Sequence, residues 1–99
     1  MLFGTKWEEE ELLLEDVLTD IGNPSELIVY NDEINTFDWV IKCFVEILDH
    51  SSEQAEQLSL IIHFKGKATV KSGPREVLKP LKDALVERGL SAVIEEIAH

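Results

Sequence analysis

The residues LIVYNDEINTFDWVIKCF, positions 27–44, decide the fold of this 99-residue chain. They begin as an aliphatic, β-branched run at 27–30, which favours a strand. Six mostly polar residues follow, ending in Asn35 and Thr36, either of which can cap a helix. Apolar side chains then return at intervals of three and four residues, at Phe37, Val40, Ile41, Phe44, Ile47 and Leu48. We therefore expect a strand, a polar turn and an amphipathic helix in direct succession.

A second helix is expected after a short connection. Ser51 and Gln54 form a capping box, in which each side chain reaches a backbone N–H near the start of the helix. Gly66 is a natural end for this helix. Its expected apolar stripe is Ala55, Leu58, Ile61 and Ile62. A strand is expected directly afterwards, at 67–71.

The last third of the chain predicts one more helix and one more strand. Pro74 fits the first turn of a helix that ends near Arg88, with Gly89 beyond its end. Pro80 deletes one backbone hydrogen bond of this helix, so we expect either a kink or a helix that begins near residue 80. Residues 90–95 alternate as a strand. The order β-α-α-β-α-β predicts an α+β fold, with a small three-stranded antiparallel sheet packed against three helices.

Composition and charge narrow the possible functions. Hydrophobic residues make up 44% of the chain and charged residues 29%, which is typical of globular domains, and the formal net charge is −11. Nucleic-acid binding is disfavoured, because its affinity comes from Lys and Arg. Seven of the nine basic residues lie between Lys65 and Arg88, where a solvated helix face is a simpler interpretation than a docking patch. One cysteine and no apolar stretch of membrane length favour a cytoplasmic protein without a membrane partner.

Residues 1–25 differ from the rest, and they predict an acidic N-terminal extension to a domain at 26–99. Four consecutive glutamates occupy positions 8–11, and a Gly-Asn-Pro sequence at 22–24 closes the segment. Four apolar residues inside it fall at helical spacing: Leu14, Val17, Leu18 and Ile21. Packing against the domain and mobility are equally compatible with this pattern.

Residues suited to catalysis or metal binding are not arranged for either. Cys43 lies on the apolar face of the first expected helix, where a buried, inert thiol is the simpler interpretation. His50, His63 and His99 share no metal-ligand spacing, and the five glycines form no phosphate-binding turn. We expect no cofactor, and an enzyme is the least favoured class. Ser59 and His63 share one helix face, a pattern at least as compatible with a structural histidine as with a ligand-binding one.

Three segments resemble the ClpS family of Clp protease adaptors: NDEINTFDWVI at 31–41, EQAEQLSLIIHFKGKA at 53–68 and RGLSAVIEE at 88–96. The family pattern is close to N-D-D-x-T-P-M-E-F-V, followed by A-x-x-L/M-M-x-x-V-H-x-x-G-x-A, and the resemblance covers residues 27–95. It implies an adaptor without catalytic activity that delivers substrates with bulky hydrophobic N-terminal residues (N-degrons) to a Clp AAA+ unfoldase and protease. The implied fold is also similar to the C-terminal domain of ribosomal protein L7/L12.

The resemblance implies a site for a free α-amino group and its neighbouring side chain. Asn31, Glu33 and His63 match the α-amino contacts of the family. They would offer an amide oxygen, a carboxylate acting directly or through water, and a neutral imidazole nitrogen, the acceptors that an ammonium group requires. A turn that caps the next helix accounts equally well for Asn31 and Asp32, and both roles can coexist. The positions that match the side-chain pocket are Asn35, Phe37, Ser59, Ile62 and Leu90.

Several positions depart from the family pattern. Asn35 replaces Thr, Thr36 replaces Pro and Phe37 replaces Met. Ser59 replaces a second Met that gates the pocket in the family, and Glu33 is one methylene longer than the Asp of the pattern. These changes predict a reshaped pocket, and they leave the preferred N-terminal side chain open.

Residues 71–88 match the family less well, in the region that carries its unfoldase-docking contacts. Glu76 aligns with a docking carboxylate, and Lys79 or Lys82 can take the place of the docking lysine. We expect a monomeric adaptor whose partners are N-degron substrates and the N-terminal domain of a Clp unfoldase. The acidic extension is expected to engage the unfoldase. The alternative is a regulator of the unfoldase that has this fold but has lost or altered N-degron binding.

Overall fold

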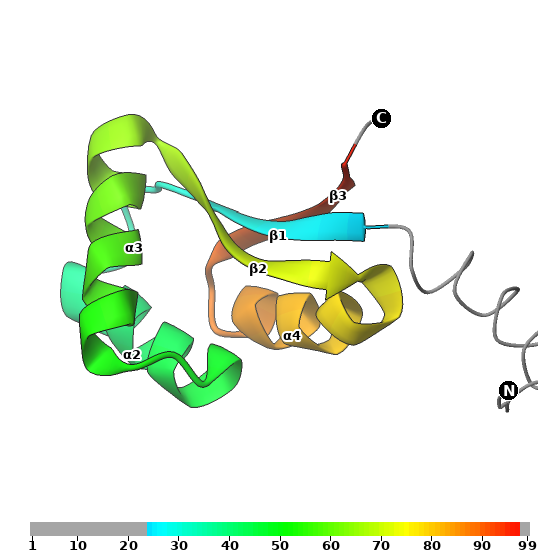
Figure 1. Ribbon diagram of the computed structural model, residues 1–99. Helices are drawn as coiled ribbons and strands as arrows, with labels where there is room; N and C mark the ends of the chain where they lie inside the picture. Colours follow the sequence, from blue (N-terminus) through cyan, green and yellow to red (C-terminus); the bar gives the residue numbers. More distant parts are fainter. Residues whose placement is uncertain (1–23, 98–99) are drawn as a thin grey trace, which may run out of the picture.

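The structure, a computed structural model, describes residues 24–97 and contains a three-stranded sheet with three helices (Figure 1). β1 (Pro24–Tyr30) is the central strand, flanked by β2 (Lys67–Pro74) and β3 (Ser91–Glu96). Both outer strands run antiparallel to β1. The expected element order and the α+β class are therefore confirmed.

The three helices are α2 (Phe37–Leu48), α3 (Ser52–Lys65) and α4 (Arg75–Glu87). Figure 1 shows α4 running beneath the strands, while α2 and α3 gather at the end of the sheet where β1 finishes. The chain enters β1 at the opposite end, beside the start of α4, because Pro24 pairs with Pro74 across β1 and β2. The molecule therefore has two distinct ends along β1.

The expected helix ends are confirmed where the sequence supplies a cap. Thr36, rather than Asn35, caps α2, and its hydroxyl oxygen accepts a hydrogen bond from the Trp39 N–H at 3.1 Å. Ser51 caps α3 by accepting from the Gln54 N–H at 3.1 Å. Gly66 ends α3 in the left-handed region, with a φ of 95°, where a residue with a Cβ would be strained.

α4 is one helix from Arg75 to Glu87 with Pro80 inside it, so the alternative of a helix that begins near residue 80 is wrong. Leu78 and Leu85, on either side of the proline, are both fully buried. Their burial offsets the one backbone hydrogen bond that Pro80 removes.

β1 begins at Pro24, three residues earlier than its hydrophobic run indicates. Ser25 pairs with Gly73 on one side and Glu96 on the other, and it is fully buried. The boundary expected after residue 25 therefore falls inside β1. The acidic extension before Pro24, including its expected helical stripe, lies outside the described residues.

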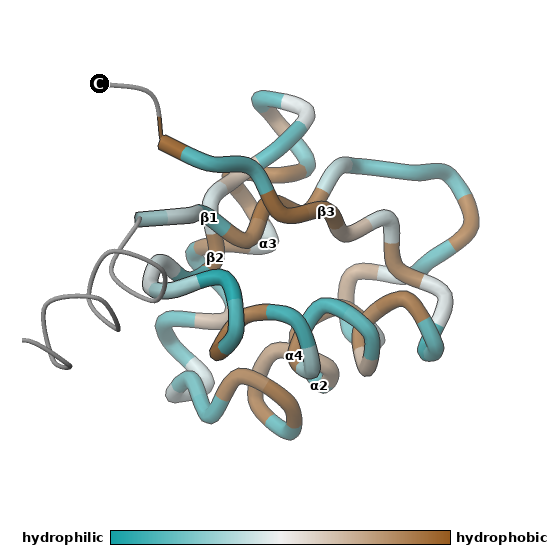
Figure 2. The backbone as a smooth tube through the Cα atoms, turned by 90° about the vertical axis from the view of Figure 1, so that its right-hand side faces the viewer, coloured by the Kyte–Doolittle hydropathy of each residue, from teal (hydrophilic) through white to brown (hydrophobic). Residues whose placement is uncertain are grey.

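The core fills the space between the sheet and the helices. Its members are Leu27, Val29, Cys43, Phe44, Leu48, Ala55, Ile62, Val70, Leu78, Leu85, Leu90 and Ala92. The prediction of a buried thiol is confirmed, and burial raises the pKa of Cys43 above its ordinary value. Figure 2 shows the apolar middle of β3 giving way to hydrophilic residues toward the C-terminus, where the strand leaves the core.

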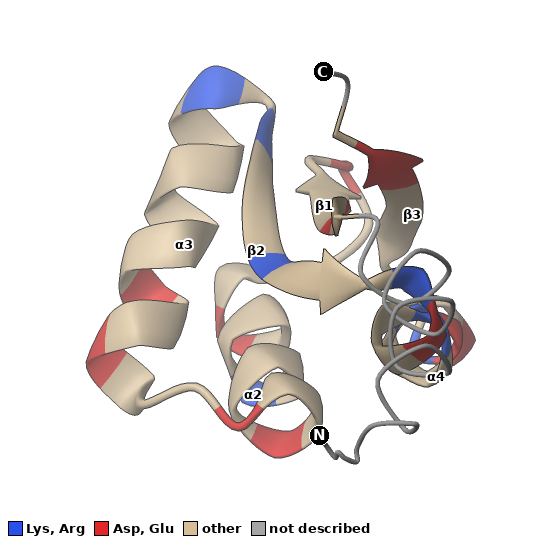
Figure 3. Ribbon diagram, turned by 45° about the vertical axis from the view of Figure 1, so that its right-hand side comes forward, with Lys and Arg blue, Asp and Glu red and all other residues tan. Residues whose placement is uncertain are grey.

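The expected apolar stripe of α3 is wrong at one position. Ile61 is 41% exposed, whereas the polar Ser59 is only 3% exposed. Ala55 and Ile62 are buried as expected. α3 therefore packs in an orientation in which Ser59, and not Ile61, faces inward. Charges along α3 follow its dipole, with acidic residues near its start and Lys65 at its end (Figure 3).

None of the helices formed by residues 24–97 has the length and apolar character needed to cross a membrane.

Candidate functional site

A cavity of about 610 Å³ opens between the turn after β1, the start of α2 and the second half of α3. Its size is typical of small-ligand sites. Apolar atoms form most of its surface. The lining residues are Asn31, Asp32, Glu33, Asn35, Phe37, Val40, Ser59, Leu60, Ile62, His63 and Phe64. Seven of the eight residues expected in the site are among them.

The turn that forms one side of the mouth is organised by Asp32. One carboxylate oxygen accepts hydrogen bonds from the backbone N–H groups of Ile34 at 2.9 Å and Asn35 at 2.8 Å. The other oxygen accepts from the Asn35 side-chain amide at 2.8 Å. Partial burial acts to raise the pKa of Asp32, but these bonds outweigh it and hold the pKa below its ordinary value. Asp32 is therefore charged at neutral pH and serves the turn itself.

Asn35 connects this turn to the loop between α4 and β3. Its side-chain amide also donates to the Gly89 carbonyl at 2.9 Å. The neighbouring Leu90 is buried and lines a separate small cavity of about 20 Å³, which shares Asn31, Asp32, Asn35, Val40 and Ile62 with the larger one. Leu90 therefore lines the small adjoining cavity and not the main one, and its expected part in the side-chain pocket stays a prediction.

A backbone hydrogen bond next to the last pair of the β1–β2 ladder, Tyr30 with Lys67, joins the turn to the end of α3. The Asn31 N–H donates to the Gly66 carbonyl at 2.8 Å, so the end of β1 is tied to the end of α3. The Asn31, Glu33 and His63 side chains are exposed and line the same cavity. Within residues 24–97, no hydrogen bond or ion pair occupies these three side chains. They form a polar rim that is available to a ligand.

The apolar wall combines expected and unexpected residues. Phe37 and Ile62 line it as expected. Val40, Leu60 and Phe64 are the additional members. Helical spacing offered a signal for each, because Val40 follows Phe37 by three residues and Leu60 precedes His63 by three and Phe64 by four. The signal is weak, since the same spacing also describes core residues.

Two histidines of the chain lie in contrasting surroundings. The His63 ring is exposed at the rim and makes an edge contact with Phe64, with ring centroids 5.0 Å apart. The His50 Nε2 lies 2.8 Å from the Val70 carbonyl oxygen, and its ring contacts Phe44 in the core. His50 is therefore the histidine that links helices to the sheet, while His63 makes no such bond within the described chain.

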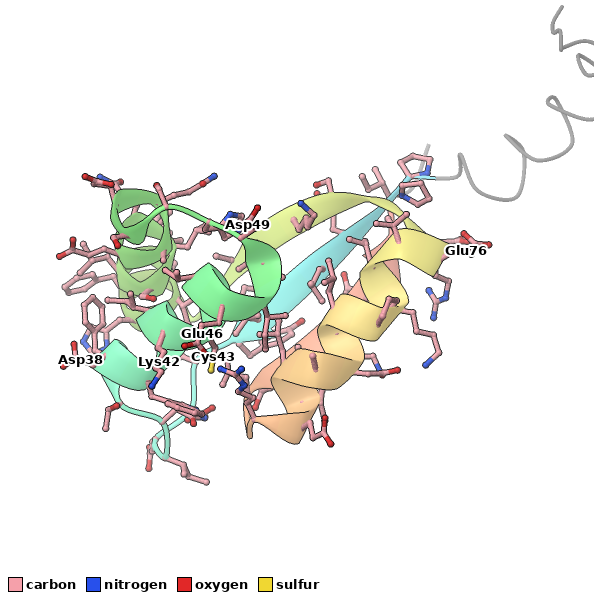
Figure 4. The ribbon with its side chains drawn as sticks, turned by 90° about the horizontal axis from the view of Figure 1, so that it is seen from below. Asp38, Lys42, Cys43, Glu46, Asp49 and Glu76 are labelled. Atoms are coloured by element: carbon pink, nitrogen blue, oxygen red, sulfur yellow. The ribbon has the colours of Figure 1, made fainter. Side chains whose placement is uncertain are left out.

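The expected docking residues lie on α4, away from the cavity. Figure 4 shows Glu76 at the end of α4 remote from α2. Lys79 and Lys82 both contact Asp83, at 2.9 Å and 3.1 Å, on the exposed side of the helix. None of these residues lines the 610 Å³ cavity. The structure thus separates the expected docking surface from the expected substrate site.

The site's chemistry is that of non-covalent binding. Within residues 24–97, no group of three or more His, Cys, Asp or Glu residues is arranged to hold a metal ion. An apolar cavity with a rim of amide, carboxylate and imidazole groups can bury a hydrophobic side chain and accept hydrogen bonds from a cationic group beside it.

Comparison with known proteins gives the family. The sequence model of the family described as ATP-dependent Clp protease adaptor protein ClpS matches residues 22–92. The chain is 30% identical to a ClpS adapter protein of Corynebacterium aurimucosum over 90% of its length and 80% of the relative's. It is 32% identical to that of Corynebacterium diphtheriae, over 89% of this chain and 77% of the relative. The chain belongs to the ClpS family of Clp protease adaptors.

The fold has a counterpart among solved structures. Agrobacterium tumefaciens ClpS2, bound to L-phenylalaninamide, superposes with a TM-score of 0.70 at 17% identity, covering 76% of this chain and 98% of that one. The likeness confirms the expected fold.

Proposed function

We propose that this chain binds the free N-terminus of proteins whose first residue is bulky and hydrophobic, and that it brings them to a Clp unfoldase. The observation that carries the proposal is the rim of Asn31, Glu33 and His63 at the mouth of a mostly apolar cavity. ClpS2 of Agrobacterium tumefaciens binds L-phenylalaninamide, a ligand with a free α-amino group and an aromatic side chain. These are the two chemical features that the rim and cavity of this chain suit.

The proposed contacts account for affinity in a useful range. Burial of a Leu or Phe side chain contributes about 1.5–3 kcal/mol. Each hydrogen bond from the ammonium to an acceptor of the rim contributes roughly 1.5–3 kcal/mol, because one partner is charged. After the cost of ordering the peptide, dissociation constants in the micromolar range or somewhat tighter are expected. An adaptor needs such a range, because it must also release its substrate.

We assign delivery of the substrate to the end of the molecule that lies away from the cavity. Glu76, Lys79 and Lys82 of α4 are proposed to contact the N-terminal domain of the unfoldase, and the acidic extension is proposed to engage the unfoldase itself. Pro24 pairs with Pro74, so the extension joins the domain beside the first turn of α4. This proximity supports a shared role for the two segments.

The decisive test is a fluorescence titration with peptides that begin with Leu, Phe, Tyr, Trp or Arg, each with a free and an acetylated N-terminus. Acetylation removes the charge and most of the donors, so affinity for the Leu peptide should fall by about tenfold to a hundredfold. Equal affinity for free and acetylated peptides would refute the proposed site. If no peptide binds, the alternative function is favoured, a regulator of the unfoldase that has lost N-degron binding.

A further inference from the structure

One residue that lines the cavity carries a buried polar atom that the described part of the chain leaves unsatisfied. Ser59 is 3% exposed, and its hydroxyl oxygen has no hydrogen-bond partner among residues 24–97. A buried serine in a helix often bonds to the carbonyl four residues earlier, but the Ser59 hydroxyl makes no such bond. Burial without a partner is costly, and most buried polar atoms in proteins have one. The hydroxyl is therefore suited to a ligand that brings its own hydrogen-bonding group.

The position of Ser59 indicates where that group must be. Ser59 and His63 both line the cavity, four residues apart on the same face of α3. His63 is exposed at the rim, whereas Ser59 is buried, so the cavity deepens from one to the other. Four residues of helix rise by about 6 Å, which is close to the length of a tyrosine side chain. A residue whose α-amino group meets His63 can therefore bring the far end of its side chain to Ser59.

The other walls of the cavity are mostly apolar. The side chains of Phe37, Val40 and Ile62, which line it, carry no polar atom. The carboxylate of Asp32 and the side-chain NH2 group of Asn35 already make hydrogen bonds within the chain. Among the lining residues, Ser59 is the one whose polar group is both buried and unpaired in the described chain.

We propose, on the basis of the function proposed above, that Ser59 is a specificity residue that makes this cavity prefer N-terminal Tyr over Phe. The two side chains differ by one hydroxyl group, which can donate to or accept from the serine. A phenylalanine ring brings no hydrogen-bonding group, so the Ser59 hydroxyl would stay unpaired when it binds. The family pattern has Met at this position, so the preference is a property of this chain rather than of the pattern.

The test compares two peptides that are identical except for Tyr or Phe at the first position, in competition with a labelled Leu-initiated peptide on the full-length chain. The Tyr peptide should bind about threefold to tenfold more tightly, which corresponds to one net hydrogen bond. Ser59→Ala should abolish the preference by weakening the Tyr peptide alone, so the ratio of the two affinities should fall to one or below, because the tyrosine hydroxyl loses its partner. The variant should fold normally, because alanine favours helix and removes an unpaired polar atom.

A matched control comes from the same molecule. Ser25 is also fully buried with an unpaired hydroxyl, but it lies in β1 at the end remote from the cavity. Ser25→Ala should leave the ratio of Tyr to Phe affinity unchanged.

The outcomes separate this inference from the function on which it rests. If both peptides bind with equal affinity, or with the same ratio before and after Ser59→Ala, the role of Ser59 is overturned while N-terminal recognition stands. Equal weakening of both peptides by Ser59→Ala would also overturn it, since the serine would then act through packing. If neither peptide binds the unmodified chain, the proposed function and the preference fall together.

Discussion

The two ends of β1 use their exposed polar residues differently. At the cavity end, the side chains of Asn31, Glu33 and His63 have no hydrogen-bond or ion-pair partner within residues 24–97. At the α4 end, Lys79 and Lys82 already share the carboxylate of Asp83. Formal charge is therefore a poor guide to binding, because what matters is whether a neighbouring residue has already satisfied the group. The cavity end is suited to bind a small cation, and the α4 end is suited to make broader contact with a partner.

The sharpest test of this division is removal of residues 1–21. If the extension serves delivery, degradation of a Leu-initiated substrate by the Clp unfoldase and protease should fall to the rate without adaptor. Affinity for the Leu peptide should not change, because among the described residues, 24–97, those lining the cavity begin at Asn31. Anisotropy titration and a degradation assay measure the two effects separately.

A second truncation provides the structural control. A chain that starts at residue 26 also loses Pro24 and Ser25. Pro24 pairs with β2, and Ser25 pairs with both β2 and β3. It should be less stable than the shorter truncation, as seen in its melting temperature. Loss of peptide affinity in the shorter truncation would show that the extension belongs to the binding site and would end the division between the two ends.

The two histidines test the cavity end itself. His63→Ala should weaken the Leu peptide by about tenfold, because one acceptor for the ammonium is lost, with little change in melting temperature. His50→Ala should do the reverse, lowering the free energy of unfolding by about 1 kcal/mol through loss of the bond to the Val70 carbonyl. A His63→Ala variant that melts earlier and binds normally would make His63 structural.

Asp32 predicts a smaller, pH-dependent effect. Asp32→Asn removes the charge and the bond from the Asn35 amide, so the free energy of unfolding at pH 7 should fall by about 1 kcal/mol. Because the pKa of Asp32 is lowered in the folded chain, its contribution is complete above the ordinary value of 3.8 and is lost as the pH falls through the lower, folded value. Urea unfolding of the unsubstituted chain and of Asp32→Asn should show a smaller difference in free energy of unfolding below pH 3.8 than at pH 7. A constant difference would mean that the charge of Asp32 does not stabilise the turn.

The smallest effects are expected at the α4 end. Lys79→Ala should weaken binding to the unfoldase N-terminal domain by about twofold, a size typical of exposed charges. Asp83→Ala should strengthen it by a similar factor, because it releases both lysines from their ion pairs. Neither change should alter affinity for the Leu peptide. Effects of the same sign in both variants would exclude a docking role for these lysines.

Local signals in the sequence predicted much of the fold. Thr36, Ser51 and Gly66 act through hydrogen bonds and backbone preference within a few residues, so the start of α2 and both ends of α3 were predictable. The start of β1 was not, because Ser25 joins the strand through pairing with Gly73 and Glu96, which are far away in the sequence. Pro80 left the start of α4 open for the same reason, since Leu78 and Leu85 on either side of it are buried by packing.

Most residues of the candidate site were predictable from the sequence, but which of them are buried was not. Spacing and family resemblance brought together the rim residues and most of the wall. They did not predict that Ser59 is buried while Ile61 is exposed, because the rotation of α3 depends on how it packs against α2 and the sheet. They also did not predict that Leu90 lines the small adjoining cavity and not the main one, because that position depends on packing between residues far apart in the sequence.

The hydrogen bond from the Asn31 N–H to the Gly66 carbonyl makes the opening of the cavity measurable at a single proton. This bond is the backbone link between the turn and the end of α3. The Asn31 amide proton can exchange with solvent deuterium only when that link breaks, although the residue itself is exposed. Its exchange rate therefore reports how often the end of β1 separates from the end of α3. A ligand that bridges Asn31 and His63 would hold both sides together and slow the exchange of this proton.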